Sequence, residues 1–244
     1  MSEEFPPEAL ECPEPDECPV AIGALSGLAT NGRLPVATVA TGQPWSRVYH
    51  SMYGHMEFNP GYGNARFSPF DSALDGARIA SIYLAASPEA ALLETALRDI
   101  DYENEPEVQD EDFHGYLHVE LLSSESFRVA DLRDEQLGVL GLERTAVSSN
   151  LSQHYPCTRT IAKAVHASTQ DLSGILWHSR QAELSGQPQE EVLVLFEERT
   201  AGGRKSFELN PGRKSIGALY EGAGRVTLDE LLEELGVNVA GPWG

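Results

Sequence analysis

Basic residues are scarce in this sequence. The chain has 17 Lys and Arg residues against 38 Asp and Glu residues, which gives a formal net charge of -21 at pH 7. A field of this sign repels phosphate backbones and anionic lipid surfaces, so neither nucleic acid nor a membrane is expected as a direct partner. The surplus of carboxylates serves solubility or attracts a basic protein partner.

Cysteines are also few. Cys12, Cys18 and Cys157 form an odd set without a Cys-x-x-Cys pair. This argues against a disulfide scaffold and against a zinc site, so no metal is expected.

Long apolar runs and phosphate-binding glycine motifs are missing. No apolar run approaches the roughly 20 residues that cross a bilayer, and the first residues lack the basic and apolar regions of a secretion signal. A cytoplasmic protein is therefore expected. No Gly-x-x-x-x-Gly-Lys-Ser/Thr motif and no strand-linked Gly-x-Gly-x-x-Gly motif occurs, which argues against a kinase or a Rossmann enzyme.

The remaining composition fits one globular domain. Of the 244 residues, 41% are hydrophobic, enough to bury a core. Residues 1–33 are acidic and rich in proline, and they are expected to form a largely mobile lead-in. Residues 34–244 are expected to form a single strand-rich domain of the mixed α+β class, because the predicted strands outnumber the helices.

Periodicity and turn residues predict the main elements. Ser87 is a plausible N-cap with Pro88 at N1, which predicts a helix that continues through Ala96. The segment 227–230, Thr-Leu-Asp-Glu, is a capping box that predicts the start of a C-terminal helix ending at Gly236. Residues 104–112 are acidic and predict a surface insertion, and residues 58–75 are predicted to form a long loop. Strands are predicted at 45–53, 79–86, 115–122, 127–132, 174–178 and 192–197, and a further helix at 158–168.

Two arginines are candidate anion ligands. Arg47 and Tyr49 share one face of a predicted strand, and a guanidinium binds pyrophosphate bidentately while an aromatic ring stacks on a cationic ring such as nicotinamide. An edge-strand arginine paired with a carboxylate is the alternative. Arg66 lies in a turn-rich loop where backbone N–H groups also meet anions.

Glu94, Tyr83 and Ser179 are the other candidates. A fixed carboxylate such as Glu94 can stabilise the oxocarbenium character that develops when a nucleoside N-glycosidic bond breaks. Arg98 stands four residues later, so an ordinary helical ion pair is the alternative. Tyr83 precedes the same helix and could reach the same pocket or pack in the core. Ser179 ends a strand and could donate to a phosphate or ribose oxygen, or serve only the turn.

These segments, taken in order, resemble the RES domain, the toxin component of RES/Xre toxin–antitoxin pairs. The resemblance rests on four segments between about Pro44 and Glu197: Arg47-Val-Tyr49, Gly63-Asn-Ala-Arg66-Phe-Ser, the stretch from Tyr83 to Glu94, and Gly174-Ile-Leu-Trp-His-Ser179-Arg180. The second segment departs from the family pattern, because Asn64-Ala65 replaces part of the usual glycine run and Phe67-Ser68 the usual aromatic-Asn pair.

The resemblance implies a fold related to the ADP-ribosyltransferase toxins and an enzyme that degrades NAD, releasing nicotinamide by phosphorolysis or hydrolysis. NAD is then a substrate and phosphate a possible co-substrate, no cofactor is expected, and an Xre-type antitoxin is the expected partner. By the same resemblance, Glu94, Arg47 and Tyr83 are the catalytic residues, and Tyr49, Arg66 and Ser179 bind the substrate. An ADP-ribosyltransferase acting on a macromolecule and a non-catalytic RES-like interaction domain are the alternatives.

Overall fold

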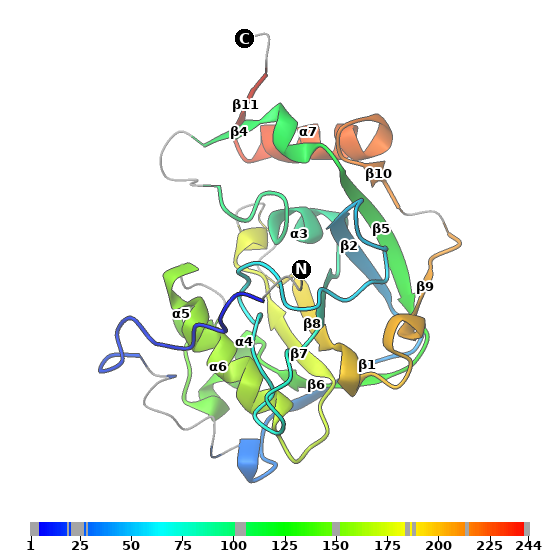
Figure 1. Cartoon of the computed structure of the whole chain (residues 1–244). Helices are drawn as coiled ribbons and strands as arrows, with labels where there is room; N and C mark the ends of the chain where they lie inside the picture. The colour runs from blue at the N-terminus through cyan, green and yellow to red at the C-terminus, as the bar shows by residue number, and fades with distance from the viewer. Residues whose placement is uncertain are drawn as a thin grey trace.

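The chain folds around a mixed β-sheet (Figure 1). The computed structural model describes residues 5–18, 20, 27, 29–100, 106–147, 152–183, 186, 189–212 and 215–241. Within this part, nine strands form one sheet in the order β1-β6-β7-β8-β3-β2-β5-β10, with β9 paired to β5. The β6–β7 pair is parallel and the other pairs are antiparallel. The predicted strand-rich α+β class is confirmed.

The elements have the following bounds. The strands of the main sheet are β1 (Val36–Val39), β2 (Pro44–His50), β3 (Ser81–Ala85), β5 (Tyr116–Ser123), β6 (Phe127–Asp131), β7 (Gly174–His178), β8 (Glu191–Phe196), β9 (Phe207–Leu209) and β10 (Gly217–Ala218). The described helices are α3 (Pro88–Leu93), α4 (Asp134–Leu137), α5 (Arg144–Val147), α6 (Tyr155–His166) and α7 (Gly222–Glu234). A separate parallel pair joins β4 (Glu107–Gln109) to β11 (Asn238–Ala240).

Both faces of the central strands are buried. Along β8, Val192 and Val194 belong to the core that also contains Leu92 of α3 and Ile161 of α6, while Leu193 belongs to a second core on the opposite face. The second core is closed by loop and strand aromatics such as Phe58 and Phe207 rather than by helices. A strand buried on both faces reads as an unbroken apolar run, which explains why β7 and β8 were predictable from the sequence.

Helix α3 begins as the sequence predicts and ends earlier. The Ser87 hydroxyl accepts the N–H of Ala90 at 3.1 Å, and Pro88 occupies the first turn, where its missing N–H costs nothing. The helix ends at Leu93, and Glu94 is its C-cap. The expectation that the helix continues through Ala96 is therefore wrong, and Arg98 does not share a helical turn with Glu94.

Three other boundaries differ from prediction. Strand β2 ends at His50 because its partner β5 begins at Tyr116, so residues beyond that pair have no ladder to join. Helix α6 begins at Tyr155, ahead of the predicted start, because Pro156 is tolerated in a first turn. The prediction that the C-terminal helix starts with a capping box at Thr227 is wrong, because Thr227 lies inside α7, which begins at Gly222.

Tertiary contact explains the early start of α7. A Cβ at Gly224 would meet the carbonyl oxygen of Ala218 at 2.1 Å, so the absent side chain allows the first turn to lie directly on β10. The predicted end is confirmed, since Gly236 follows the helix with φ of +66°.

Residues 5–18, part of the segment predicted as a mobile lead-in, lie against the domain. Lys163 of α6 binds both carboxylate oxygens of Glu8 at 2.9 Å, and Arg159 donates to the Glu8 carbonyl at 3.0 Å. Phe5 lies with its ring centroid 5.0 Å from that of Tyr62. Residues 1–4, 19, 21–26 and 28 of the same segment lie outside the described residues.

The acidic segment 104–112 is described only from residue 106, where it forms β4 and the 3₁₀ turn Asp110–Phe113. The predicted loop 58–75 is confirmed, since residues 51–80 contain neither helix nor strand. Among the helices described, none is long and apolar enough to span a bilayer.

Candidate functional site

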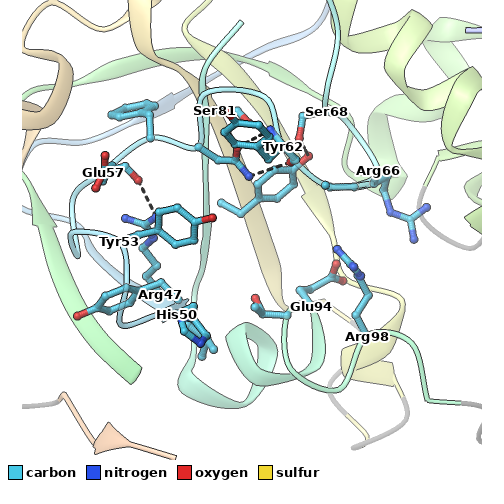
Figure 2. Close-up of a pocket in the computed structure, with 18 of the residues that line it drawn as sticks. Arg47, His50, Tyr53, Glu57, Tyr62, Arg66, Ser68, Ser81, Glu94 and Arg98 are labelled. Atoms are coloured by element: carbon cyan, nitrogen blue, oxygen red, sulfur yellow. Dashed lines mark hydrogen bonds between the residues drawn. The ribbon is translucent and has the colours of Figure 1, made fainter. Parts of the chain in front are cut away.

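A pocket of about 260 Å³ opens where β2, β3, the turn after α3 and the first turn of α6 meet. Figure 2 shows Arg47, Tyr53 and Glu57 on one side of it and Arg66, Glu94 and Arg98 on the other. Its lining includes Arg47, Tyr49, Tyr53, Glu57, Tyr62, Arg66, Ser68, Tyr83, Glu94, Arg98, Tyr116 and Tyr155.

The structure brings the six predicted site residues to one place. Arg47, Tyr49, Arg66, Tyr83 and Glu94 line the pocket, and Ser179 binds Glu94 from behind without lining it. Residues from five separate segments therefore meet, as a shared site requires. Their roles toward a substrate stay predictions.

Glu94 is held by a buried hydroxyl. Ser179, fully buried after β7, donates to Glu94 Oε1 at 2.5 Å, and its oxygen accepts the N–H of Ala182 at 3.1 Å. The backbone N–H of Glu94 caps α3 by donating to Ala90 at 2.9 Å. Arg98 binds its neighbour Asp99 at 3.2 Å, in place of the helical ion pair with Glu94 considered above. The Glu94 carboxylate is thus held by the hydrogen bond from Ser179 behind it, while Glu94 itself lines the pocket.

Arg47 supports the opposite wall. The residue is 8% exposed, and its guanidinium donates to the carbonyls of His55 at 2.6 Å, Glu57 at 2.7 Å and Gly54 at 3.4 Å. Burial lowers the pKa of Arg47 to about 10, against the opposing effects of Tyr49 and Glu57, so the group stays cationic at neutral pH. Because most of its donors bind the segment 54–57, the observed contacts of Arg47 position that wall.

The Arg47 guanidinium also lies 5.4 Å from the centroid of the Tyr49 ring, as expected for two side chains on one strand face. Burial raises the pKa of Tyr49, and Arg47 partly offsets this effect. Tyr49 is therefore a neutral phenol that presents its ring to the pocket.

Arg66 is held between two elements. It donates to the carbonyl of Val147 at 2.9 Å, and its guanidinium lies 5.3 Å from the centroid of the Tyr155 ring. Its own carbonyl accepts the hydroxyl of Thr158. The first turn of α6 therefore fixes the loop that carries Arg66, despite the departure from the family's glycine pattern.

The hydroxyl group of Tyr83 forms hydrogen bonds inside the protein. That hydroxyl accepts the N–H of Phe67 at 3.0 Å and lies 3.1 Å from Ser68 Oγ. Burial raises the pKa of Tyr83 to about 12, so it is neutral at physiological pH and does not act as a base. Its ring packs edge-on against Trp177, which fixes the wall of the pocket.

Sequence reasoning missed the aromatic character of the site. Six of the eight tyrosines of the chain line this one pocket, and four of them, Tyr53, Tyr62, Tyr116 and Tyr155, were not predicted. Nothing in their spacing indicated this, because they come from the loop 51–80, the start of β5 and the start of α6. Arg98 was considered only as a partner of Glu94, although it lines the pocket itself.

The charge of the pocket differs from that of the whole chain. Among the described lining residues, three arginines stand against two glutamates, whereas the chain carries -21. A local excess of guanidinium groups inside an acidic protein attracts an anionic ligand, and the surrounding rings suit flat ring systems. The site therefore matches a ligand that combines phosphates with planar rings.

Comparison with protein families agrees with this arrangement. The model of the RES domain matches residues 39–213, which is 175 (213 − 39 + 1) of 244 residues and includes all six predicted site residues. The chain belongs to the RES domain family. Neither the curated proteins nor the solved structures gave a significant match.

Proposed function

We propose that this protein is an enzyme that consumes NAD by cleaving the N-glycosidic bond between nicotinamide and ribose. The RES domain family is associated with NAD use and with toxin–antitoxin systems. The observation that carries the proposal is the Glu94 carboxylate, oriented by buried Ser179 and placed in a pocket of arginines and tyrosines.

Glu94 would stabilise the developing cation. When the C1′–N bond breaks, its electron pair leaves with nicotinamide, which departs as a neutral pyridine and needs no proton. Positive charge then grows on the ribose as an oxocarbenium ion. A carboxylate that is already oriented stabilises this charge without reorganisation during the reaction.

The remaining walls would bind the two ends of the nicotinamide nucleotide. The tyrosine rings would enclose the pyridinium ring, which attracts the negative face of an aromatic ring. Arg66 and Arg98 would contact the phosphates, and Arg47 would contribute mainly by fixing the wall of residues 54–57. A pocket of about 260 Å³ is slightly smaller than the range of about 300–1,000 Å³ for small-molecule sites, which suits one nucleotide half with the other at the mouth.

The acceptor of the ribosyl cation is phosphate or water. Phosphate attack at C1′ gives a sugar phosphate, while water attack gives ADP-ribose and a proton. Purified protein incubated with NAD, with and without phosphate, distinguishes them by product mass. Transfer to a macromolecule would leave label from adenine-labelled NAD on protein or nucleic acid.

Two variants make this assay specific. Glu94→Gln should nearly abolish nicotinamide release, whereas Glu89→Gln, on the same helix and away from the pocket, should retain it. The proposal is wrong if the wild type releases no nicotinamide under any of these conditions, or if both variants release it equally.

We further propose that an antitoxin of the Xre type covers the mouth of this pocket. A basic partner would be attracted by the charge of -21, giving an association rate that falls steeply with added salt. Mixing the two proteins before adding NAD should abolish nicotinamide release. A co-encoded regulator that binds tightly and leaves turnover unchanged would contradict occlusion.

A further inference from the structure

All three cysteines of the chain meet at one place away from the pocket. Cys12 and Cys18 come from the N-terminal segment, and Cys157 comes from the first turn of α6. Their sulfur atoms all lie within 4.8 Å of one another, and none of the three forms a disulfide. The sequence argued against such a site because the three cysteines form an odd set without a Cys-x-x-Cys pair, and Cys157 stands 139 positions (157 − 18) from its nearest partner. Only the docking of the N-terminal segment on α6 creates the cluster.

The spacing of the sulfur atoms suits a shared cation. A Zn–S bond of about 2.3 Å places thiolates about 3.8 Å apart in a tetrahedral site and about 4.0 Å apart in a trigonal one. The three sulfur atoms lie at most 4.8 Å apart. They therefore need to shift by less than about 1 Å to bind one shared cation. A disulfide needs only two thiols. The three that meet here match the ligand set of a metal site better than a disulfide.

The surroundings leave one side of the cluster accessible. Cys157 is 3% exposed and belongs to the core, while Cys12 and Cys18 are half-buried. An ion could enter from the solvent side and keep that coordination position for water or another ligand. Exposed carboxylates beside the two N-terminal cysteines, those of Glu11, Glu14, Asp16 and Glu17, give this side a negative potential that favours cations.

Contacts outside the thiol groups also hold the cluster together. The N–H groups of Glu17 and Cys18 both donate to the carbonyl of Glu14, at 3.2 and 3.0 Å, closing a turn that brings Cys18 back toward Cys12. The ion pair between Glu8 and Lys163 anchors the same segment further along α6. The ligands are thus supplied by two elements that are already fixed to each other.

We propose that Cys12, Cys18 and Cys157 form a binding site for one thiophilic d¹⁰ cation, with Zn²⁺ as the reference ion. Three thiolates select soft and borderline cations over Mg²⁺ or Ca²⁺, which require oxygen ligands. The ion fastens the N-terminal segment to the helix whose first turn also holds the loop of Arg66, through the Thr158 hydroxyl. The site is structural, and the proposal is independent of NAD cleavage.

Metal titration of the full chain tests this proposal. Protein purified with reductant and stripped of metal should bind one Zn²⁺ per chain, with a rise in melting temperature. Co²⁺ should give a thiolate-to-metal charge-transfer band in the near ultraviolet, and Zn²⁺ should displace it. Each single substitution Cys12→Ser, Cys18→Ser or Cys157→Ser should weaken the apparent affinity by about 100-fold or more, because one of the three thiolate ligands is lost.

A control separates loss of a ligand from loss of docking. Glu8→Gln removes the ion pair to Lys163 and leaves the three thiols in place, so it should retain the charge-transfer band and bind Zn²⁺ within about tenfold of the wild type. The triple Ser variant should bind no Co²⁺ while keeping the circular dichroism of the folded domain.

Three results would overturn the proposal. The first is a fully reduced wild type that binds neither cation. The second is binding that survives in the triple Ser variant. The third is a protein that holds no cation and forms a Cys12–Cys18 disulfide in air, seen as a mass loss of two hydrogens, which would identify the cluster as a dithiol with a neighbouring free thiol.

Discussion

Ser179 donates to Glu94 Oε1 at 2.5 Å although 85 positions separate the two residues in the chain. The serine is fully buried and does not line the pocket, so a substrate reaches the carboxylate and not the hydroxyl. The same hydroxyl oxygen accepts the N–H of Ala182, which fixes its proton toward Glu94. This geometry favours a positioning role for Ser179, and the substrate contact that the family resemblance implies stays a prediction.

Ser179→Ala tests that role through a split of the kinetic constants. A hydrogen bond to a charged group contributes about 1.5–3 kcal/mol, so kcat should fall by about 10- to 100-fold while KM changes little. The double variant Ser179→Ala/Glu94→Gln should be no slower than Glu94→Gln alone, because the serine acts only through the carboxylate. Additive losses, or a large rise in KM for Ser179→Ala, would identify a direct substrate contact instead.

Glu94→Gln removes the charge and keeps the shape of the side chain. We expect turnover to fall by about 100-fold or more with the dissociation constant for NAD nearly unchanged, because the charge acts on the developing cation. Calorimetric titration measures binding, and single-turnover nicotinamide release measures the chemical step. Equal losses of binding and turnover would assign Glu94 to ground-state recognition.

We expect Arg47 to support the pocket wall and Arg98 to bind the substrate, so their alanine variants should differ in stability. Arg47→Ala leaves three backbone carbonyls of the segment 54–57 without their donors, so the free energy of unfolding should fall by about 2–3 kcal/mol and KM should rise. Arg98 is more exposed and its ion pair is with Asp99. Arg98→Ala should therefore raise KM and leave stability within about 0.5 kcal/mol of the wild type.

Urea unfolding and initial rates on the same preparations compare the two variants. Arg47→Lys is a useful third variant, because a single ammonium cannot reach all three carbonyls in the fork geometry. If Arg47→Ala unfolds like the wild type and loses only NAD binding, then the arginine contacts substrate directly and the supporting role is wrong.

Stability should depend on His118 between pH 6.5 and 4. Burial lowers the pKa of His118 from 6.5 to about 4, and its Nδ1 accepts the N–H of Ile216 at 3.2 Å. The unfolded chain binds a proton in this window and the folded chain does not. Stability is therefore complete above pH 6.5 and is lost as the pH falls toward 4, by up to about 3 kcal/mol.

His118→Asn keeps an acceptor for Ile216 and removes the titration. Carboxylates also titrate at low pH, so the informative quantity is the difference between the free energies of unfolding of wild type and variant, measured in urea at each pH. That difference should change by the stated amount between pH 7 and 4. A constant difference across this range would show that His118 contributes nothing to the acid sensitivity.

The sequence by itself determined the strand-rich α+β class and the positions of β7 and β8, because a strand buried on both faces needs a continuous apolar run. It also determined the start of α3, since the Ser87 cap and Pro88 act within four residues of each other. Arg47, Tyr49, Arg66, Tyr83 and Glu94 were found as candidates because their residue types and order match a family pattern.

Only the tertiary structure decided what these residues contact. The start of α7 depends on where β10 lies, because Gly224 packs directly on Ala218, and local propensity does not encode this contact. Six tyrosines meet at one pocket because β2, β3, β5, α6 and the loop 51–80 converge there. Ser179 lies on the protein side of Glu94 because the chain after β7 packs against α3. The three cysteines meet because the N-terminal segment docks on α6. Periodicity fixes which face of an element is apolar, but contacts between distant segments arise only when all the elements pack together.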